Sequence, residues 1–283
     1  MTVLEKILDT LWNYNDAAKS EALFKDLFSN EIGNQAEILT QIARAQGLQG
    51  KFDEAHKTLN EVERLEKDGR IQVRYLLERG RVYNSSKQGD KATSLFLEAY
   101  ALGKSIGADF YTIDAAHMMA IAETSNQQLS WHETALELCE TTTDDHAKKW
   151  LGSVTNNAAW TYHDLGRYEE ALETFQKALA WHKQQGKPET IRIAKWSVAR
   201  CLRSLGGYQE ALEIQKRILA ECEAGFIQDG YVYEELGECL LALDQENKAK
   251  PYFAKAHEFL TQDSWFVKNE NVRLQRLKDL GFS

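Results

Sequence analysis

One pattern recurs six times along this chain and limits what the chain can fold into. In the stretch GSVTNNAAWTYHDLGRYEEALETFQKAL, which starts at Gly152, small and aromatic residues occur at fixed offsets around a central glycine. Comparable stretches start near residues 36, 73, 115, 192 and 230, so neighbouring copies lie 37 to 42 residues apart. Each copy has two apolar stripes with a 3.6-residue period and a short turn between them, which predicts an antiparallel pair of helices.

The residues that carry this pattern resemble those of the tetratricopeptide repeat, a helix pair of about 34 residues. The copy at 152 shows the small, aromatic and turn positions of that family at Ala158, Ala159, Tyr162, Gly166, Tyr168, Ala171, Phe175 and Ala178. The longer spacing here is similar to that of kinesin light chains and of bacterial peptide receptors. The resemblance implies an all-α solenoid, a right-handed superhelix in which the first helix of each pair lines a concave groove.

We expect one continuous array over residues 1–283, because each repeat of such a stack contacts only its neighbours. The predicted units are 36–72, 73–114, 115–151, 152–191, 192–229 and 230–262, and the unit at 115 departs most from the pattern. Residues 1–35 are predicted to form an atypical helix pair, with a single kinked cap helix as the alternative. Residues 263–283 are predicted to form a C-terminal capping helix, with a dimerisation helix as the alternative.

Glycine and proline indicate where these helices begin and end. Gly69, Gly107, Gly186 and Gly225 recur near the ends of units, where a helix C-cap favours left-handed backbone. Pro188 suits the first turn of a helix, and Pro251 is expected early in another. The chain has only these two prolines, which agrees with helices throughout.

Composition narrows the class of function. The formal net charge of −9 argues against non-specific nucleic-acid binding, which needs a basic surface. No run approaches the ~20 apolar residues of a membrane-spanning helix, and the N-terminus has no signal-peptide pattern. The four cysteines contain no CxxC, are too sparse for a disulfide scaffold, and are expected to pack inside. We therefore expect a cytoplasmic protein that binds neither nucleic acid nor membrane.

The resemblance also implies which residues face the groove. Asn156 and Asn157 stand in mid-helix, where asparagine is a poor helix former, and their amides can pair with the backbone of an extended peptide. A hydrogen bond to the next helix, or solvation, is the alternative. Trp160 and Trp196 would join neighbouring cations in a patch of hot-spot composition, or else pack between helices. The candidate binding residues are Arg81, Asn84, Met119, Glu123, Asn156, Asn157, Trp160, His163, Trp196, Arg200, Arg203, Tyr231 and Glu234.

The charges divide along the chain. Residues 151–200 hold seven basic and five acidic side chains, whereas residues 201–250 hold five and ten, and residues 101–150 hold three and eight. A cationic middle would suit a ligand carboxylate held by the guanidinium forks of Arg200 and Arg203. The clamp that some tetratricopeptide repeat proteins use for chaperone C-termini is not expected, because only Asn157 matches its residues.

No catalytic, metal or cofactor site is expected. The seven histidines lack metal-ligand spacing, and Glu98 stands where a phosphate loop ending at Gly103–Ser105 needs glycine. We therefore expect a non-catalytic scaffold or adaptor, monomeric or homodimeric, that binds a protein or peptide partner in its groove. One alternative is a sensor that closes around a small ligand or signalling peptide. A further alternative is an enzyme with a concave-face site near His163, Asp164 and Arg200.

Overall fold

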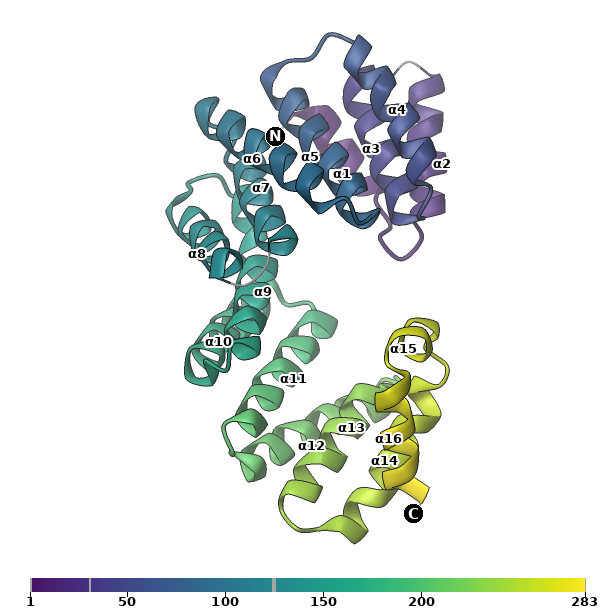
Figure 1. The fold of residues 1–283 in the computed structure, drawn as a ribbon, viewed down its shortest axis with the longest axis vertical. Helices are drawn as coiled ribbons and strands as arrows, with labels where there is room; N and C mark the ends of the chain where they lie inside the picture. Colours follow the sequence, from purple (N-terminus) through teal and green to yellow (C-terminus); the bar gives the residue numbers. More distant parts are fainter. Residues whose placement is uncertain (1, 31, 124–125, 283) are drawn as a thin grey trace. The chain divides into compact units, whose positions relative to one another are not determined.

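The computed structural model describes residues 2–30, 32–123 and 126–282, without the side chain of Asn126. Over these residues the chain is all-α, with sixteen α-helices, one short 3₁₀ helix and no strand, which confirms the predicted fold class. The helices group into two compact units, Met1–Val154 (unit 1) and Thr155–Ser283 (unit 2). Figure 1 labels the helices of both. The single continuous array over residues 1–283 stays a prediction.

Unit 1 consists of helices that pack as consecutive pairs. Its elements are α1 (Val3–Leu11), α2 (Ala17–Ser29), α3 (Gln35–Leu48), α4 (Phe52–Arg64), α5 (Gly69–Ser85), α6 (Gly89–Ser105), α7 (Asp109–Ala122), α8 (Asn126–Thr141) and the 3₁₀ helix η1 (Ala147–Trp150). Helices α3, α5 and α7 are the first helices of three pairs, and α5 packs against both of the others. Before α3 the chain forms two separate helices, α1 and α2.

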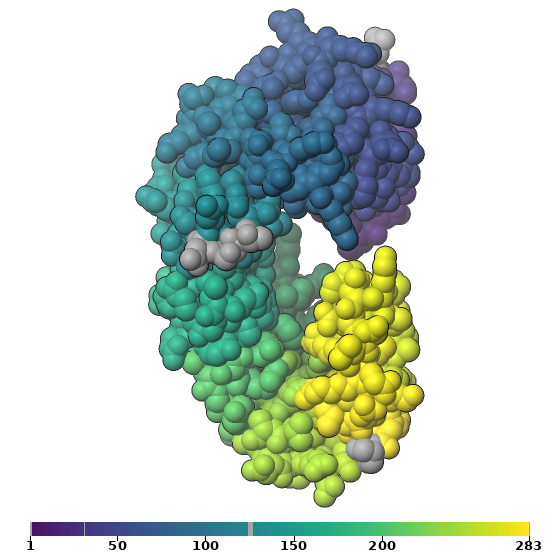
Figure 2. Space-filling model, viewed as in Figure 1, coloured from purple at the N-terminus to yellow at the C-terminus, as the bar shows by residue number. Residues whose placement is uncertain are grey.

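Unit 2 repeats the same arrangement. The boundary between the units falls within α9 (Leu151–Asp164). The elements that follow are α10 (Tyr168–Gln185), α11 (Pro188–Ser204), α12 (Tyr208–Ala224), α13 (Gly230–Ala242), α14 (Glu246–Leu260), α15 (Ser264–Asn269) and α16 (Asn271–Phe282). Pro188 begins α11 and Pro251 lies inside α14, as predicted. Helix α16 packs on α14, and the yellow surface in Figure 2 belongs to this C-terminal part of unit 2.

The predicted single capping helix is divided into α15 and α16. Asp263 caps α15 by accepting hydrogen bonds from the backbone N–H groups of Trp265 and Phe266. The Asn269 side-chain amide donates to the Trp265 carbonyl, and the next residue, Glu270, leaves helical backbone at φ −121° and ψ 33°. An asparagine side chain that takes a backbone carbonyl competes with the helix, so the break has a local cause.

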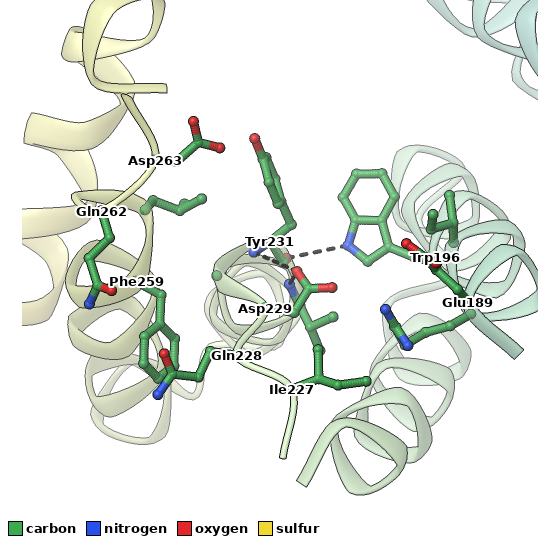
Figure 3. Close-up of a pocket in the computed structure, with 14 residues that line it drawn as sticks. Glu189, Trp196, Ile227, Gln228, Asp229, Tyr231, Phe259, Gln262 and Asp263 are labelled. Atoms are coloured by element: carbon green, nitrogen blue, oxygen red, sulfur yellow. Dashed lines mark hydrogen bonds between the residues drawn. The ribbon is translucent and has the colours of Figure 1, made fainter. Parts of the chain in front are cut away.

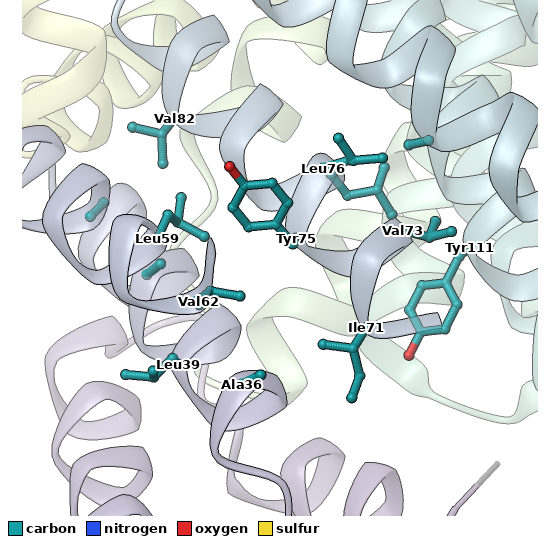
Figure 4. Packing of buried hydrophobic residues seen from close by; sticks show 14 of the residues in the cluster. Ala36, Leu39, Leu59, Val62, Ile71, Val73, Tyr75, Leu76, Val82 and Tyr111 are labelled. Carbon is teal, nitrogen blue, oxygen red and sulfur yellow. The ribbon is translucent and has the colours of Figure 1, made fainter. Parts of the chain in front are cut away.

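The helix pairs close around a small residue on one helix and a phenylalanine ring on the next. A Cβ atom on Gly80 would lie 2.4 Å from the Phe96 ring, and one on Gly237 would lie 2.7 Å from the Phe253 ring. Both rings are buried. The small and aromatic positions of the repeat therefore set the distance between paired helices. Figure 4 shows part of the unit 1 core, where residues of α3, α4, α5 and α7 form one cluster.

Left-handed backbone closes the turns inside several pairs. Gly166 has φ +74° between α9 and α10. In the corresponding turn between α5 and α6, Lys87 has φ +62°, a conformation that costs about 1–2 kcal/mol for a residue with a Cβ atom.

Two of the four predicted cap glycines need correction. Gly107 and Gly186 have positive φ, as expected. Gly69 is instead the first residue of α5, where a Cβ atom would lie 3.2 Å from Ile106. Gly225 has φ −93° because the next residue, Phe226, takes the left-handed conformation at φ +54°.

Candidate functional site

Three helices of unit 2 place side chains around one hollow of about 420 Å³, which we call the charged pocket. Helices α9, α11 and α13 are first helices of successive pairs, and α16 reaches the same hollow. The ring centroids of Trp160 and Trp196 lie 6.1 Å apart and join α9 to α11. The charged pocket is lined by Trp160 of α9, by Trp196, Arg200 and Arg203 of α11, by Glu234, Glu235 and Glu238 of α13, and by Arg273 and Arg276 of α16.

One buried carboxylate, that of Glu235, holds two of these arginines. It accepts hydrogen bonds from Nε and Nη2 of Arg203 at 2.8 and 2.9 Å, and Arg200 Nε lies 3.2 Å from its Oε1. Burial acts to lower the pKa of the Arg203 guanidinium, but its hydrogen bonds to Glu235 and the charge of that carboxylate outweigh burial and raise the pKa. The expectation of two free guanidinium forks is therefore corrected, because the Arg203 fork is occupied within the protein. The Arg200 side chain keeps 26% exposure and a single contact to the carboxylate.

Helix α16 supplies two more arginines to the charged pocket. Arg273 donates from Nε and Nη2 to Glu234 at 2.6 and 2.7 Å, and Arg276 pairs with Glu238. Burial raises the pKa of the Glu234 carboxyl, and Arg273 offsets this only in part. Four guanidinium groups thus face three carboxylates, which leaves the lining with one net positive charge.

Trp196 also lines a second, larger hollow of about 700 Å³, which we call the apolar pocket. Its apolar wall consists of Ile193, Trp196, Ile227, Tyr231, Val232, Phe259 and Leu260. The indole Nε1 donates to the backbone oxygen of Tyr231 at 3.3 Å, and Figure 3 shows the two rings facing the same space. The remaining lining residues are Glu189, Arg192, Gln228, Asp229, Gly230, Gln262 and Asp263. The half-buried indole is therefore shared by both pockets.

A stripe along α11 connects the two pockets. Arg192, Trp196 and Arg200 are four residues apart, so they lie one above the other at intervals of about 6 Å on one side of the helix. Arg192 lines the apolar pocket and Arg200 the charged pocket. Within the described part of the chain, the buried Nε of Arg192 has no hydrogen-bond partner. The stripe therefore offers a cation on each side of an aromatic ring.

Three predicted residues of α9 do not line either pocket. Asn156 and Asn157 are half-buried, and the Asn156 amide lies 3.4 Å from the Asn157 side-chain oxygen. His163 Nε2 lies 2.9 Å from the Ser204 hydroxyl, and burial together with the Arg200 charge lowers the His163 pKa. A serine beside a histidine is a pairing that nucleophilic catalysis uses. Here Asp164 Oδ1 is 3.7 Å from Nδ1 of the histidine, beyond hydrogen-bond distance.

The predicted residues of unit 1 fall into different surroundings. Arg81 and Asn84 line a hollow of about 420 Å³, and Arg81 is paired with Glu78 at 2.8 Å and with Asp114. Met119 is a correction, because its side chain is 4% exposed and packs in the core. The reason is that α7 is buried on every side from residue 111 to residue 120, so a groove position there is covered. Glu123 follows the last residue of α7 and is half-buried.

Sequence reasoning missed the two arginines of α16. Arg273 and Arg276 are three residues apart on one face of a helix, and Leu277, four residues after Arg273, is fully buried next to them. Glu234 and Glu238 form the matching acidic pair one turn apart on α13. That complementary spacing was the available signal, but nothing in the repeat period places the terminal helix against α13.

Other predicted features concern the whole chain. All four cysteines are buried, as predicted, and burial raises the pKa of the Cys239 thiol to about 12. In residues 2–30, 32–123 and 126–282, no helix combines the length and apolar character needed to cross a bilayer. The same residues contain no group of three or more His, Cys, Asp or Glu side chains arranged to hold a metal ion.

Sequence comparisons identify similar proteins. Two family models of the tetratricopeptide repeat match residues 127–184 and 156–225. Outer dynein arm-docking complex subunit 4 of Xenopus laevis is 26% identical over 119 residues, which are 42% of this chain and 22% of that protein. The chain thus matches about a fifth of the length of this relative.

Solved structures with a similar fold include both types that the repeat spacing resembles, the peptide receptors and the kinesin light chains. Apo RapI has a TM-score of 0.71 at 15% identity, over 97% of this chain and 85% of that chain. NprR in complex with its cognate peptide NprX has a TM-score of 0.54 at 16% identity, over 95% and 81%. The TPR-like repeats of a putative kinesin light chain from Podosopora anserina give 0.54 at 18% identity, over 66% and 94%. At these sequence identities, the similarity to the three structures concerns the fold alone.

Proposed function

We propose that this chain, which is a tetratricopeptide repeat protein, is a non-catalytic scaffold that holds an extended segment of a protein or peptide partner in unit 2. The observation that carries the proposal is that the charged pocket and the apolar pocket share the half-buried ring of Trp196. A ligand that enters both pockets contacts this ring over a large area. Tryptophan and arginine in such positions supply much of the energy of protein interfaces.

The stripe on α11 defines the chemistry of the ligand. Residues two apart in an extended peptide are separated by about 6.6 Å, which matches the rise of about 6 Å between Arg192, Trp196 and Arg200. An apolar side chain against Trp196 therefore places acidic side chains, two positions before and after it, near the two arginines. The apolar pocket has room for a large aliphatic or aromatic side chain. We therefore assign this surface an acidic–apolar–acidic segment with one residue between neighbouring contacts.

The arginine side chains of the charged pocket are preorganised for such a ligand. Arg203, Arg273 and Arg276 are fixed by their glutamates, so little side-chain freedom remains to be lost there. Arg200 makes a single contact to Glu235 and one to Ser204, and can accept a ligand carboxylate beside them. The surplus of one positive charge in the charged pocket favours an acidic side chain there, while Arg192 in the apolar pocket lies among the carboxylates of Glu189, Asp229 and Asp263. The structure of NprR with its peptide supports the proposal to the extent that a related fold accommodates a peptide.

A displayed library of short random peptides, selected on the full chain, tests this proposal. We expect the enriched peptides to contain an apolar residue with acidic residues two positions away, and Trp196→Ala to abolish the enrichment. Trp181→Ala is the matched control, because Trp181 lies on α10 outside both pockets. Enrichment of basic peptides, or equal enrichment on both variants, would contradict the assignment.

A second candidate function is a sensor for a small ligand or signalling peptide. The volume of the apolar pocket favours it, because small-molecule sites typically measure about 300–1,000 Å³. A free small molecule that raises the melting temperature of the wild type but not of Ile193→Glu would favour the sensor. The monomeric or homodimeric state and the cytoplasmic location stay predictions.

A further inference from the structure

The N-terminal helix α1 lies across the first helices of unit 1. Trp12, directly after α1, donates from Nε1 to Gln41 Oε1 on α3 at 2.9 Å. Glu5 of α1 approaches Arg70 of α5 at 3.4 Å and accepts a hydrogen bond from the Tyr111 hydroxyl of α7 at 2.9 Å. We call the surface beneath α1 the covered face. It consists of Gln41 and Arg44 of α3, Arg70, Arg74, Leu77, Glu78 and Arg81 of α5, and Phe110, Tyr111 and Asp114 of α7.

The acidic side of α1 matches cationic and hydroxyl groups on unit 1. Glu5 and Asp9 are one helical turn apart, and Asp9 Oδ2 lies 3.3 Å from His146 Nε2. Burial acts to raise the pKa of the Glu5 carboxyl, but hydrogen bonds from Thr2 and Tyr111 and the charge of Arg70 outweigh it and lower the pKa. The pKa of Asp9 is lowered in the same way, because the hydrogen bond and the charge of His146 outweigh the effect of burial. Both carboxylates are therefore bound in their charged form.

The apolar side of α1 is anchored next to these acids. Leu8 is fully buried, and Trp12 packs edge-on against Phe24 with ring centroids 5.0 Å apart. The Arg44 guanidinium lies over the Trp12 ring at 5.9 Å. Leu8 and Trp12 are four residues apart, like Glu5 and Asp9, so α1 presents an acidic stripe and an apolar stripe side by side.

The covered face has its own internal pairs that do not depend on α1. Arg74 donates to Glu37 at 2.6 Å, Arg44 lies 3.3 Å from Glu78, and Arg81 lies 2.8 Å from Glu78. The side-chain contacts named above from Glu5, Asp9 and Trp12 are additional to these pairs. The covered face is thus organised by the repeats, and α1 rests on it as an amphipathic helix rests in the groove of a partner.

We propose that the covered face is a second docking surface, which binds an acidic amphipathic helix of a partner protein in competition with α1. The occupant is defined by the features of α1: two carboxylates one turn apart, with an aliphatic and an aromatic residue one turn apart beside them. Because α1 is joined to α2 by a short connection, its effective concentration at this surface is on the order of millimolar, and a partner helix must compete with that. This proposal is independent of the function proposed for unit 2.

The test uses a fluorescent synthetic peptide with the sequence of residues 2–16 and the full chain as the receptor. In one variant, Leu8→Ala and Trp12→Ala remove the apolar packing contacts between α1 and the rest of unit 1. In a second variant, Glu5→Gln and Asp9→Asn remove only the negative charges of α1 and leave its buried apolar residues unchanged. We expect both variants to bind the peptide at least about tenfold more tightly than the wild type does, because their own α1 competes less well. Glu54→Gln with Glu61→Gln, on the exposed side of α4, is the matched control and is expected to bind like the wild type.

Charge specificity is measured with a second peptide that carries Glu5→Lys and Asp9→Lys. We expect this peptide to bind both variants at least about tenfold more weakly than the first, because like charges then face Arg70 and Arg74. Variants that keep the helical circular dichroism of the wild type but bind the first peptide no better would show that α1 is a fixed cap. Equal binding of the two peptides, or dimerisation of the variants through their own α1, would also overturn the proposal.

Discussion

The two units carry the same kind of face on their first helices, but the two faces differ in what covers them. In unit 1, α1 lies over α3, α5 and α7 and leaves a hollow of about 80 Å³ beside it, while a further hollow of about 420 Å³ at Arg81 and Asn84 stays uncovered. In unit 2, the face of α9, α11 and α13 bears the charged pocket of about 420 Å³, which adjoins the apolar pocket of about 700 Å³. The repeat pattern therefore builds the face, and residues outside the pattern decide which part of it is covered.

The Arg74–Glu37 pair of unit 1 differs from the shared carboxylate of Glu235 in unit 2, although unit 1 also has a shared carboxylate, that of Glu78, which contacts Arg44 and Arg81. In unit 1, Arg74 and Glu37 form a close pair whose side chains are 10% and 7% exposed. In unit 2, Glu235 is equally buried, but it is shared by Arg200 and Arg203, which both keep contact with water. A satisfied and buried pair stabilises its unit, whereas a shared carboxylate leaves a cation able to accept a ligand.

The largest expected effect is the removal of a buried carboxylate. Glu37→Ala is expected to lower the free energy of unfolding by about 3–5 kcal/mol, because it leaves the Arg74 charge buried without its closest partner. Glu235→Ala is expected to cost about 1.5–3 kcal/mol, since Arg200 and Arg203 can be solvated. Urea unfolding followed by unit-resolved hydrogen exchange measures both. Equal losses in the two units would remove the distinction between the faces.

An intermediate effect concerns acid pH and unit 1. Burial lowers the pKa of His132 to about 4, and burial also lowers that of His117 beside it. The unfolded chain binds protons on these histidines below about pH 6.5 and the folded chain does not, so stability falls as pH decreases from there. His132 alone accounts for a loss of up to about 3 kcal/mol by pH 4.

Denaturant midpoints at a series of pH values measure this loss. His132→Phe is expected to reduce the pH dependence of unit 1, and His257→Phe on α14 of unit 2 is the control. The assignment of this acid sensitivity to His132 fails if His132→Phe leaves the pH dependence of unit 1 unchanged.

The smallest effect concerns the turns inside the helix pairs. Lys87→Gly in unit 1 is expected to raise the free energy of unfolding by about 1 kcal/mol, because glycine adopts φ +62° without strain. Gly166→Ala in the corresponding turn of unit 2 is expected to lower it by a similar amount. Thermal melting points of the two variants measure these shifts. Melting shifts of the same sign would show that the two turns are not equivalent.

Much of the fold follows from local sequence signals. The turn at Gly166, the start of α11 at Pro188 and the close approach of Gly80 to Phe96 depend on residues within one helix pair. The break at Glu270 was missed because it depends on how the Asn269 side chain competes for a backbone carbonyl.

The candidate site was predictable only where it follows the repeat period. Trp160, Trp196, Arg200 and Arg203 come together in the charged pocket because each occupies a groove position of α9 or α11. Arg273 and Arg276 belong to a terminal helix whose position no repeat prescribes. The position of α1 is not prescribed by the repeats either, so its sequence predicts a helix but not the surface on which that helix lies.

The most direct test of the central claim is the affinity of one library-selected peptide for the full chain and two tryptophan variants, measured by isothermal titration calorimetry. The account predicts that Trp196→Ala weakens binding by about 2 kcal/mol, roughly thirtyfold, because the ring that both pockets share is removed. It predicts that Trp181→Ala changes the affinity by less than about twofold, since Trp181 lines neither pocket. Unchanged affinity with Trp196→Ala, in a variant that melts like the wild type, would contradict the assignment of binding to unit 2.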